Sequence, residues 1–190
     1  LVFKRRLVVS FHEESHEYDG TAHRPACQAS GLAEGHCLEI RTACPPVDVT
    51  NGFVEVPVLG LRVTSRSGRD VTRRYAAEVG LPRVRIVPRR LTLRSASASM
   101  VWDGEHALSR EEVIVHGLAE GETLSARGVG RAAEVGSIEN TIAIDWASST
   151  ARAENYEVVL MPGTLEIMER PLVAVGKNLR VVYDGKPHCL

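Results

Sequence analysis

The sequence predicts an all-β protein built from tandem repeats, and three observations support this prediction. Three segments align without gaps, each running from a leucine to an aromatic-Asp-Gly triplet: residues 7–20, 91–104 and 172–185. The pentapeptide GLAEG occurs at residues 31–35 and again at 117–121. Short apolar runs of period two, separated by clusters of Gly, Asn and Asp, are typical of strands joined by turns. Ordered matches of this kind indicate a repeat array.

The spacing of the repeat sets the predicted domain boundaries. The leading leucines are Leu7, Leu91 and Leu172, so the offsets are 91 − 7 = 84 and 172 − 91 = 81. We therefore expect the following division: 1–6, the tail of a preceding repeat; 7–89, repeat domain 1; 90–170, repeat domain 2; 171–190, the truncated start of repeat 3. The last segment lacks most of its strands, so we expect it to fray. Only Pro and Arg separate the units, which favours stiff joints.

Within each repeat the pattern predicts strands and tight turns. Residues 141–146 and 164–167 alternate as half-buried strands do. The Asp-Gly pairs at 19–20, 103–104 and 184–185 are turn dipeptides, and residues 148–155 have room for one helical turn. We predict tandem Ig-like β-sandwich repeats, with β-grasp-like repeats carrying one short helix as the alternative. Units of about 80 residues bury modest cores, so contacts between neighbouring repeats are expected to add stability.

The composition excludes several function classes. With 23 Lys and Arg against 24 Asp and Glu, the net charge is -1, so we expect no nucleic-acid partner. The basic runs near the junctions then predict solvated faces and ion pairs between repeats. No run approaches the roughly 18 apolar residues of a membrane span, so no membrane insertion is expected. Four cysteines are too few for a disulfide framework. A Cys27–Cys37 bridge stays open, with free, buried thiols as the default.

The motifs of the repeat resemble those of a known family. The first unit carries Tyr-Asp-Gly-Thr at 18–21, SGLAEGH at 30–36 and GRDVTRRY at 68–75, and the second carries VGSIEN at 135–140 and GTLEI at 163–167. In this order they resemble the YDG/MBG-type repeat of bacterial cell-wall-anchored surface proteins, over nearly the whole chain. Two departures are Leu-Pro-Arg-Val at 81–84 in place of Gly-Thr-Leu, and Trp102 in place of tyrosine.

The resemblance implies a function outside catalysis. We expect a structural stalk region that spaces an adhesive tip from the cell wall, with neighbouring repeats as its partners. The expected location is extracellular, on the bacterial cell surface, attached through other parts of the protein. The alternative is an adhesive module that binds a host glycan or mucin. A polar or aromatic concavity shared by both units favours binding, whereas surfaces that differ between units favour the stalk.

Each aromatic-Asp-Gly triplet is followed by a histidine, which defines a candidate ligand contact. The candidates are Tyr18, Asp19, His23, Trp102, Asp103 and His106. Histidine and aspartate near a turn are suited to a cation or a sugar hydroxyl, and an aromatic ring to a sugar face. The simpler interpretation is that the aromatic residues anchor a core at a strand end while His23, His106 and His188 face solvent. We favour this simpler interpretation.

Residues 12–16 read His-Glu-Glu-Ser-His and match the zinc-protease motif. That chemistry requires a helix, which brings both histidines to one metal. Here the motif follows Leu-Val-Val-Ser-Phe and precedes a turn, so a strand is predicted, and in a strand the two side chains lie about 13 Å apart. The aligned positions 96–100 and 177–181 carry no ligand set. We therefore predict a charged edge strand, with no metal, no cofactor and no enzymatic activity.

Overall fold

The regular structure of the chain is almost entirely β. The computed structural model describes residues 3–176, 180 and 182–186, and these contain eighteen strands and two short 3-10 turns. No α-helix occurs among them, so the helix required by the β-grasp alternative is not found in the described part. No helix in that part is long and apolar enough to cross a membrane. The predicted all-β class is confirmed.

The strands fall into two halves that follow each other along the chain. The first half spans residues 5–87. Its elements are β1 (Arg5–Phe11), β2 (Glu13–Glu17), β3 (Cys27–Ser30), β4 (Cys37–Thr42), β5 (Val54–Glu55), β6 (Val58–Thr64), η1 (Thr72–Arg74), β7 (Tyr75–Val79) and β8 (Arg83–Val87). They form three small sheets, with strand orders β3-β1-β7, β2-β8-β5 and β4-β6.

The second half spans residues 89–168. Its elements are β9 (Arg89–Ser95), β10 (Ala98–Val101), β11 (Leu108–Ser109), β12 (Val113–His116), β13 (Ser125–Gly128), β14 (Arg131–Ala132), β15 (Gly136–Asn140), β16 (Ile142–Asp145), η2 (Ala153–Asn155), β17 (Tyr156–Met161) and β18 (Gly163–Met168). The sheets are β12-β9-β17, β10-β18-β15 and β13-β16, with an additional pair β11-β14.

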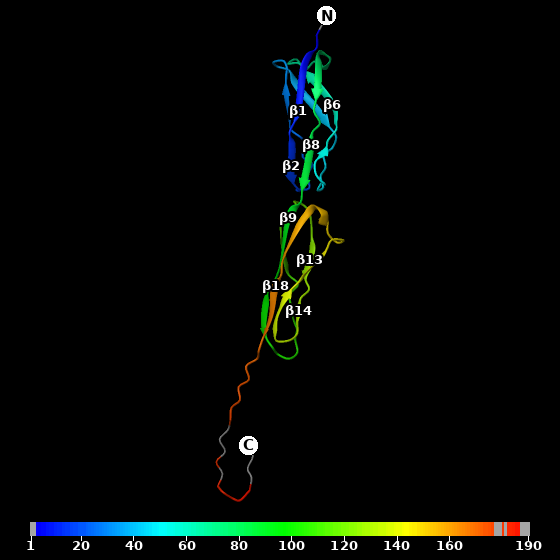
Figure 1. The fold of residues 1–190 in the computed structure, drawn as a ribbon. Helices are drawn as coiled ribbons and strands as arrows, with labels where there is room; N and C mark the ends of the chain where they lie inside the picture. Colours follow the sequence, from blue (N-terminus) through cyan, green and yellow to red (C-terminus); the bar gives the residue numbers. More distant parts are fainter. Residues whose placement is uncertain (1–2, 177–179, 181, 187–190) are drawn as a thin grey trace.

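The two halves share one topology. In each, the leading strand pairs antiparallel with one neighbour and parallel with a late strand: β1 with β3 and β7, β9 with β12 and β17. The chain then bends and pairs parallel with the last strand, as β2 does with β8 and β10 with β18. All strand pairs among the described residues lie within one half. The halves follow one another end to end along a rod (Figure 1).

The observed strands match the sequence predictions closely. β16 and β18 lie where period two predicted strands, and η2 supplies the single helical turn expected within residues 148–155. The leading strands begin at Arg5 and Arg89, two residues and one residue before the predicted starts of the repeats. Backbone amides after Asp19, Asp103 and Asp184 donate to the aspartate side chains, which closes the predicted turns.

A buried asparagine holds the bend between β9 and β10. The Asn140 side chain accepts a hydrogen bond from the Gly130 amide (3.0 Å) and donates to the carbonyls of Ala96 (2.9 Å) and Arg110 (2.8 Å). Its own carbonyl accepts from the hydroxyl of Ser95. These irregular segments lack strand partners at the bend, and the fully buried Asn140 satisfies their backbone groups.

The first glycine of each GLAEG segment crosses the leading strand of its half at close range. Gly31 and Gly117 have φ values of 86° and 97°, and an added Cβ would meet the carbonyl oxygens of Arg6 and Arg90 at 2.2 Å. Both glycine carbonyls accept a hydrogen bond from the arginine Nε that opens the leading strand, Arg5 (2.8 Å) or Arg89 (2.7 Å). The repeated GLAEG segment thus packs against the leading strand of each half and is hydrogen-bonded to its first arginine.

We expect Gly117→Ala to destabilise the second half by about 2–4 kcal/mol, because both its positive φ and its close approach to the Arg90 carbonyl exclude a side chain. Gly121→Ala is the matched control, since Gly121 has a similar φ of 80° but open space around it. Urea unfolding measures both variants. Equal losses would show that the φ alone matters and that the close approach does not.

The remaining segments bear on three further predictions. Residues 12–16 lie in and just before β2, an edge strand of its sheet, as predicted for the charged HEESH segment. Cys27, Cys37 and Cys44 are free thiols, but they are exposed, so the expectation of buried thiols is wrong. Cys27 lies on the edge strand β3, and Cys37 lies on β4 of a two-stranded sheet. Residues 171–176 form no strand, and the expectation of fraying at 177–179, 181 and 187–190 lies outside the described residues.

Candidate functional site: the joint between the halves

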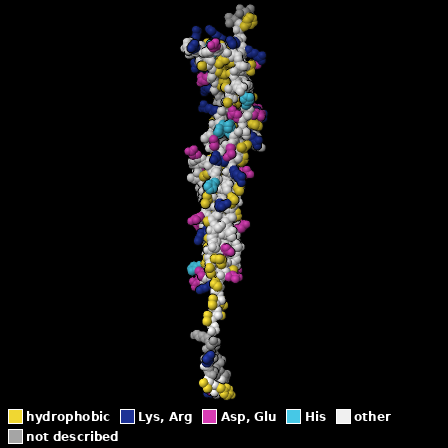
Figure 2. All heavy atoms as spheres, turned by 90° about the vertical axis from the view of Figure 1, so that its left-hand side faces the viewer, with side chains coloured by type: hydrophobic (Ala, Val, Ile, Leu, Met, Phe, Trp, Pro, Cys, Tyr) yellow, Lys and Arg dark blue, Asp and Glu magenta, His cyan; other side chains and the backbone are white. Residues whose placement is uncertain are grey.

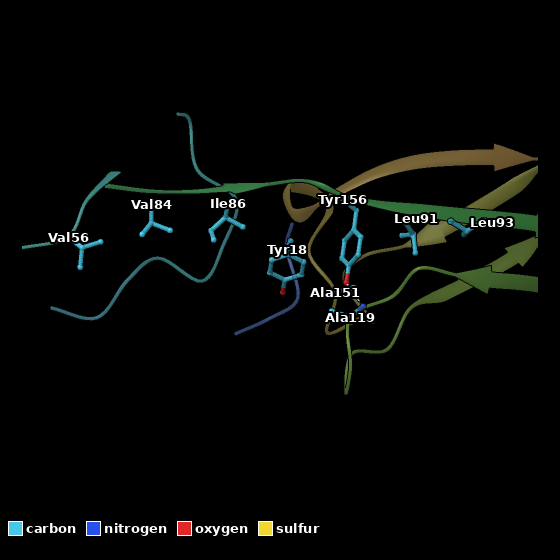
Figure 3. Close-up of a cluster of buried hydrophobic side chains, with 9 residues drawn as sticks. All are labelled: Tyr18, Val56, Val84, Ile86, Leu91, Leu93, Ala119, Ala151 and Tyr156. Atoms are coloured by element: carbon cyan, nitrogen blue, oxygen red, sulfur yellow. Dashed lines mark hydrogen bonds between the residues drawn. The ribbon is translucent and has the colours of Figure 1, made fainter. Parts of the chain in front are cut away.

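One cluster of buried apolar side chains crosses from the first half into the second. Its members are Tyr18, Val56, Val84 and Ile86 from the first half and Leu91, Leu93, Ala119, Ala151 and Tyr156 from the second. Figure 3 shows them in a row along the rod, with the two tyrosines where the halves meet. We call this meeting region the joint. The two halves therefore share one buried apolar core across the joint.

A single carboxylate ties both tyrosines of the joint together. The Tyr18 hydroxyl donates to Glu122 Oε1 at 2.6 Å, and the Tyr156 hydroxyl donates to Glu122 Oε2. The two rings meet edge to face with centroids 5.5 Å apart, a favourable aromatic geometry. The Tyr156 hydroxyl also accepts from the amide of Ala119 at 2.9 Å. Glu122 thus links Tyr18 of the first half to Tyr156 of the second half, and Tyr156 is itself bonded to the GLAEG segment through Ala119.

A second polar bridge lies beside the tyrosines. The amide of Val49 donates to Asn155 Oδ1, and Asn155 Nδ2 donates to Asp48 Oδ1, both at 2.9 Å. Asn155 is fully buried, so its side chain depends on these first-half partners. Two exposed ion pairs add to the joint, Arg152 with Asp48 at 3.2 Å and Arg89 with Glu17 at 4.0 Å. Arg89 belongs to one of the basic runs near the junctions, whereas Arg152 lies outside them, and exposed pairs of this kind contribute little energy.

Burial and the carboxylate change the acidity of both tyrosines. Desolvation, followed by the hydrogen bond to Glu122, raises the pKa of Tyr18 to about 12. The same two causes raise the pKa of Tyr156 to about 12. The folded state therefore favours the neutral form of both phenols.

The joint is expected to weaken at alkaline pH. Because the folded pKa values lie near 12 and the ordinary value is 10, the stabilisation is fully present below pH 10 and is lost as pH rises from 10 through 12. Urea midpoints measured across this range should fall for the native chain and fall less for Tyr18→Phe, which cannot ionise at that position. Identical pH profiles for the two proteins would exclude Tyr18 as the titrating group.

Of the first candidate set, the structure places Tyr18 in the joint and Asp19 and His23 beside it. Tyr18 is only 4% exposed, so it anchors a core, as favoured from the sequence, and presents no face to a sugar. Asp19 accepts from the amide and hydroxyl of Thr21 and pairs with His23 at 3.1 Å. The His23 ring stacks on His16 at 4.1 Å. Both polar candidates are thus engaged in stabilising the turn after Tyr18.

The second candidate set lies at the opposite end of the second half. Trp102 is 45% exposed, and Asp103 accepts from the backbone amides of Glu105 and His106. The His106 ring contacts Asp103 Oδ2 at 2.8 Å and is largely exposed. These hydrogen bonds hold the pKa of Asp103 well below its usual range. The prediction of a solvent-facing histidine therefore describes His106 better than the partly covered His23, and His188 lies outside the described residues.

The described residues form no candidate metal centre. No group of three or more His, Cys, Asp or Glu side chains there is arranged to hold a metal ion. Glu14 and His16 of the HEESH segment contact each other at 3.1 Å on the strand β2. Figure 2 shows acidic and basic side chains interspersed along one face of the rod, without a continuous basic stripe on that face.

Shallow hollows occur at equivalent places in both halves, away from the six candidate residues. In the first half such a hollow lies over β4 and β6 and is lined by Arg41 and Gly60. In the second half the corresponding hollow lies over β13 and β16 and is lined by Arg127 and Ala143. Strand register makes these pairs equivalent, since Arg41 pairs with Gly60 and Arg127 with Ala143. The other lining residues differ in charge, because Arg62 corresponds to Asp145.

Of the residues that join the halves, the sequence patterns singled out Tyr18 but not Glu122, Asn155 or Asp48. Glu122 directly follows the second GLAEG segment, and His36 follows the first, where its Nδ1 lies 2.7 Å from the Tyr75 hydroxyl. A polar residue directly after GLAEG in both repeats was therefore a signal in the sequence for a contact with the tyrosine of that repeat. Asn155 and Asp48 offered none, because Arg74 occupies the position of Asn155 in the first repeat.

Comparison with protein-family models, with curated proteins and with solved structures finds no match to this chain. The class of the protein therefore follows from its own geometry. The described part is an elongated all-β protein made of two halves of like topology that share a core at their joint.

Proposed function

We propose that this chain is a non-catalytic stalk region of a bacterial surface protein, made of tandem Ig-like β-sandwich repeats that hold an adhesive tip away from the cell wall. The observation that carries the proposal is the parallel pairing, in both halves, of the first two strands with the last two: β1 with β7 and β2 with β8, and β9 with β17 and β10 with β18. The family resemblance of the motifs supports the extracellular, cell-surface location.

Parallel pairing of these strands suits a part that bears tension. The chain enters each half on β1 or β9 and leaves on β8 or β18, at the opposite end of that half. The parallel ladders hold five and five residue pairs in the first half and six and four in the second. Ladder hydrogen bonds lie across the strand direction, so tension along the rod loads them together in shear.

The joint supplies the second property that a stalk needs, which is stiffness between units. The shared apolar cluster and the Glu122 and Asn155 bridges oppose bending at the connection between the halves. Pro88 alone connects β8 to β9, and its ring limits backbone rotation there. Bending would expose apolar surface and leave buried polar groups without partners.

Force spectroscopy tests the proposal, with the four cysteines replaced by serine and handles attached at the two ends. We expect two unfolding events of nearly equal length gain, because the halves span residues 5–87 and 89–168. Pulling between positions 41 and 60, which lie opposite each other on β4 and β6, is the control that unzips one pair. End-to-end pulling should need clearly more force; equal forces would contradict a load-bearing role.

A glycan- or mucin-binding module is the second candidate, favoured by the equivalent hollows that Arg41 and Arg127 line. An arginine in a shallow cleft suits an acidic sugar, whose carboxylate it binds through two parallel hydrogen bonds. A screen of sialylated and neutral glycans tests this function. Binding that is lost in the double variant Arg41→Ala, Arg127→Ala and retained in Arg94→Ala would favour it over the stalk.

A further inference from the structure

We propose that the exposed end of the second half, around Trp102, is a docking surface for a third repeat, which covers it as the second half covers Tyr18. The proposal rests on the proposed stalk function and names the partner of its free end. We call this end the tip and define it by Val101, Trp102, Val135 and Met168.

The tip repeats the backbone geometry of the first half at the joint. The Tyr18 amide donates to the carbonyl of Val87, and the Trp102 amide donates to the carbonyl of Met168, both at 2.9 Å. In each case the aromatic residue follows an edge strand and precedes a turn closed by aspartate. The chain also leaves both ends in the same way, from the strand that pairs parallel with that edge strand.

The covering differs between the two ends, and so do the flanking residues, since Val101 at the tip corresponds to Glu17 at the joint. Tyr18 is 4% exposed because residues of the second half lie on it, whereas Trp102 is 45% exposed. Three apolar neighbours of Trp102 are also nearly half exposed, Val101, Val135 and Met168. Val101 pairs directly with Met168, and Gly136, which follows Val135, pairs with Ile167, so Val101, Met168 and Val135 lie at the same end of three adjacent strands. Exposed apolar side chains gathered at one end of a domain mark an interaction site.

The start of the first half carries an arrangement equivalent to the one that covers Tyr18 in the joint. There the Tyr75 hydroxyl accepts from the Ala33 amide at 3.1 Å and contacts His36, as Tyr156 is held by Ala119 and Glu122 in the joint. We call this arrangement the head. Ala119 is buried in the joint, whereas Ala33 is only partly buried. A head and a tip are therefore the two complementary sides of one joint.

The sequence after the second half supports a third unit as the occupant. Residues 172–185 repeat the pattern of residues 91–104, and Pro171 corresponds to the junction that precedes β9. A third head following Pro171 would meet the tip in the geometry of the observed joint. In the joint the Tyr18 hydroxyl donates to Glu122, the residue after GLAEG. The indole N–H of Trp102 is also a donor, and the polar residue after GLAEG in the third unit would be its acceptor.

A single-tryptophan chain tests this docking. Trp146→Phe leaves Trp102 as the only tryptophan. In the extended protein, a copy of residues 7–90, which contains no tryptophan and brings its own head, replaces residues 172–190 so that its first leucine takes the place of Leu172. We expect Trp102 emission to shift to the blue and acrylamide quenching to fall severalfold relative to the unextended chain.

A matched variant separates docking from mere proximity. Ala33→Arg in the copied head places a charge in the surface that must cover Trp102, and quenching should return to the unextended value. If circular dichroism shows that the copy of residues 7–90 does not fold, a copy of residues 91–170 takes its place as the third unit. Both tryptophans of that copy are replaced by phenylalanine.

The proposal is overturned if Trp102 is quenched equally with and without a folded third unit. It is also overturned if quenching falls but Ala33→Arg has no effect. Failure of the stalk function has a different signature, namely a low end-to-end unfolding force or a freely bending joint between the first and second halves.

Discussion

Tyr18→Ala is expected to loosen the joint and to cost about 3–5 kcal/mol of the coupling between the halves, as truncation of a buried aromatic residue does. The substitution removes the ring that packs on Tyr156 and one of the two hydroxyls on Glu122. Spin labels at Ser67, in the turn after β6 and close to the free start of the first half, and Glu105, near the tip, report the result. The single narrow distance distribution expected for the native chain should become broad.

Two controls accompany this prediction. Trp102→Ala removes the equivalent residue at the tip, where it is partly exposed, so it should leave the distance distribution unchanged. Tyr18→Phe keeps the ring and loses one hydroxyl, which should cost about 1–2 kcal/mol because the acceptor carries a charge. If Tyr18→Ala leaves the distribution narrow, the joint does not depend on the shared core and our account of its stiffness is wrong.

Asn140→Leu is expected to destabilise the second half by about 3–5 kcal/mol, because it keeps the side-chain volume but removes three hydrogen bonds from a fully buried position. Those bonds join the side chain to the Gly130 amide and the carbonyls of Ala96 and Arg110. Urea unfolding measures the change. The first half lacks this network, so hydrogen exchange should show faster amides chiefly in β9, β10, β15 and β18.

The same substitution at an exposed asparagine is the control. Asn51 lies in an exposed bend of the first half, so Asn51→Leu should change the free energy of unfolding by less than about 0.5 kcal/mol. A loss of similar size at both positions would mean that the buried network adds nothing specific to stability.

The local structure of this protein was readable from its sequence because it depends on neighbours along the chain. Period-two alternation predicted β16 and β18, and the aspartate-closed turns follow from side chains that reach amides two residues away. The repeated GLAEG segment likewise predicted equivalent structure at two places, which Gly31 and Gly117 bear out with the same approach to the leading strand.

The sequence by itself thus determined the all-β class, the positions of β16 and β18 and the aspartate-closed turns, whereas the tertiary structure decided what each repeated residue does. Tyr18, Trp102 and Tyr183 occupy one repeat position, yet they are 4%, 45% and 94% exposed. The difference arises because the atoms that cover Tyr18 belong to residues such as Glu122, which lies 104 positions away in the chain. Burial depends on what folds against a residue, and no local pattern carries that information.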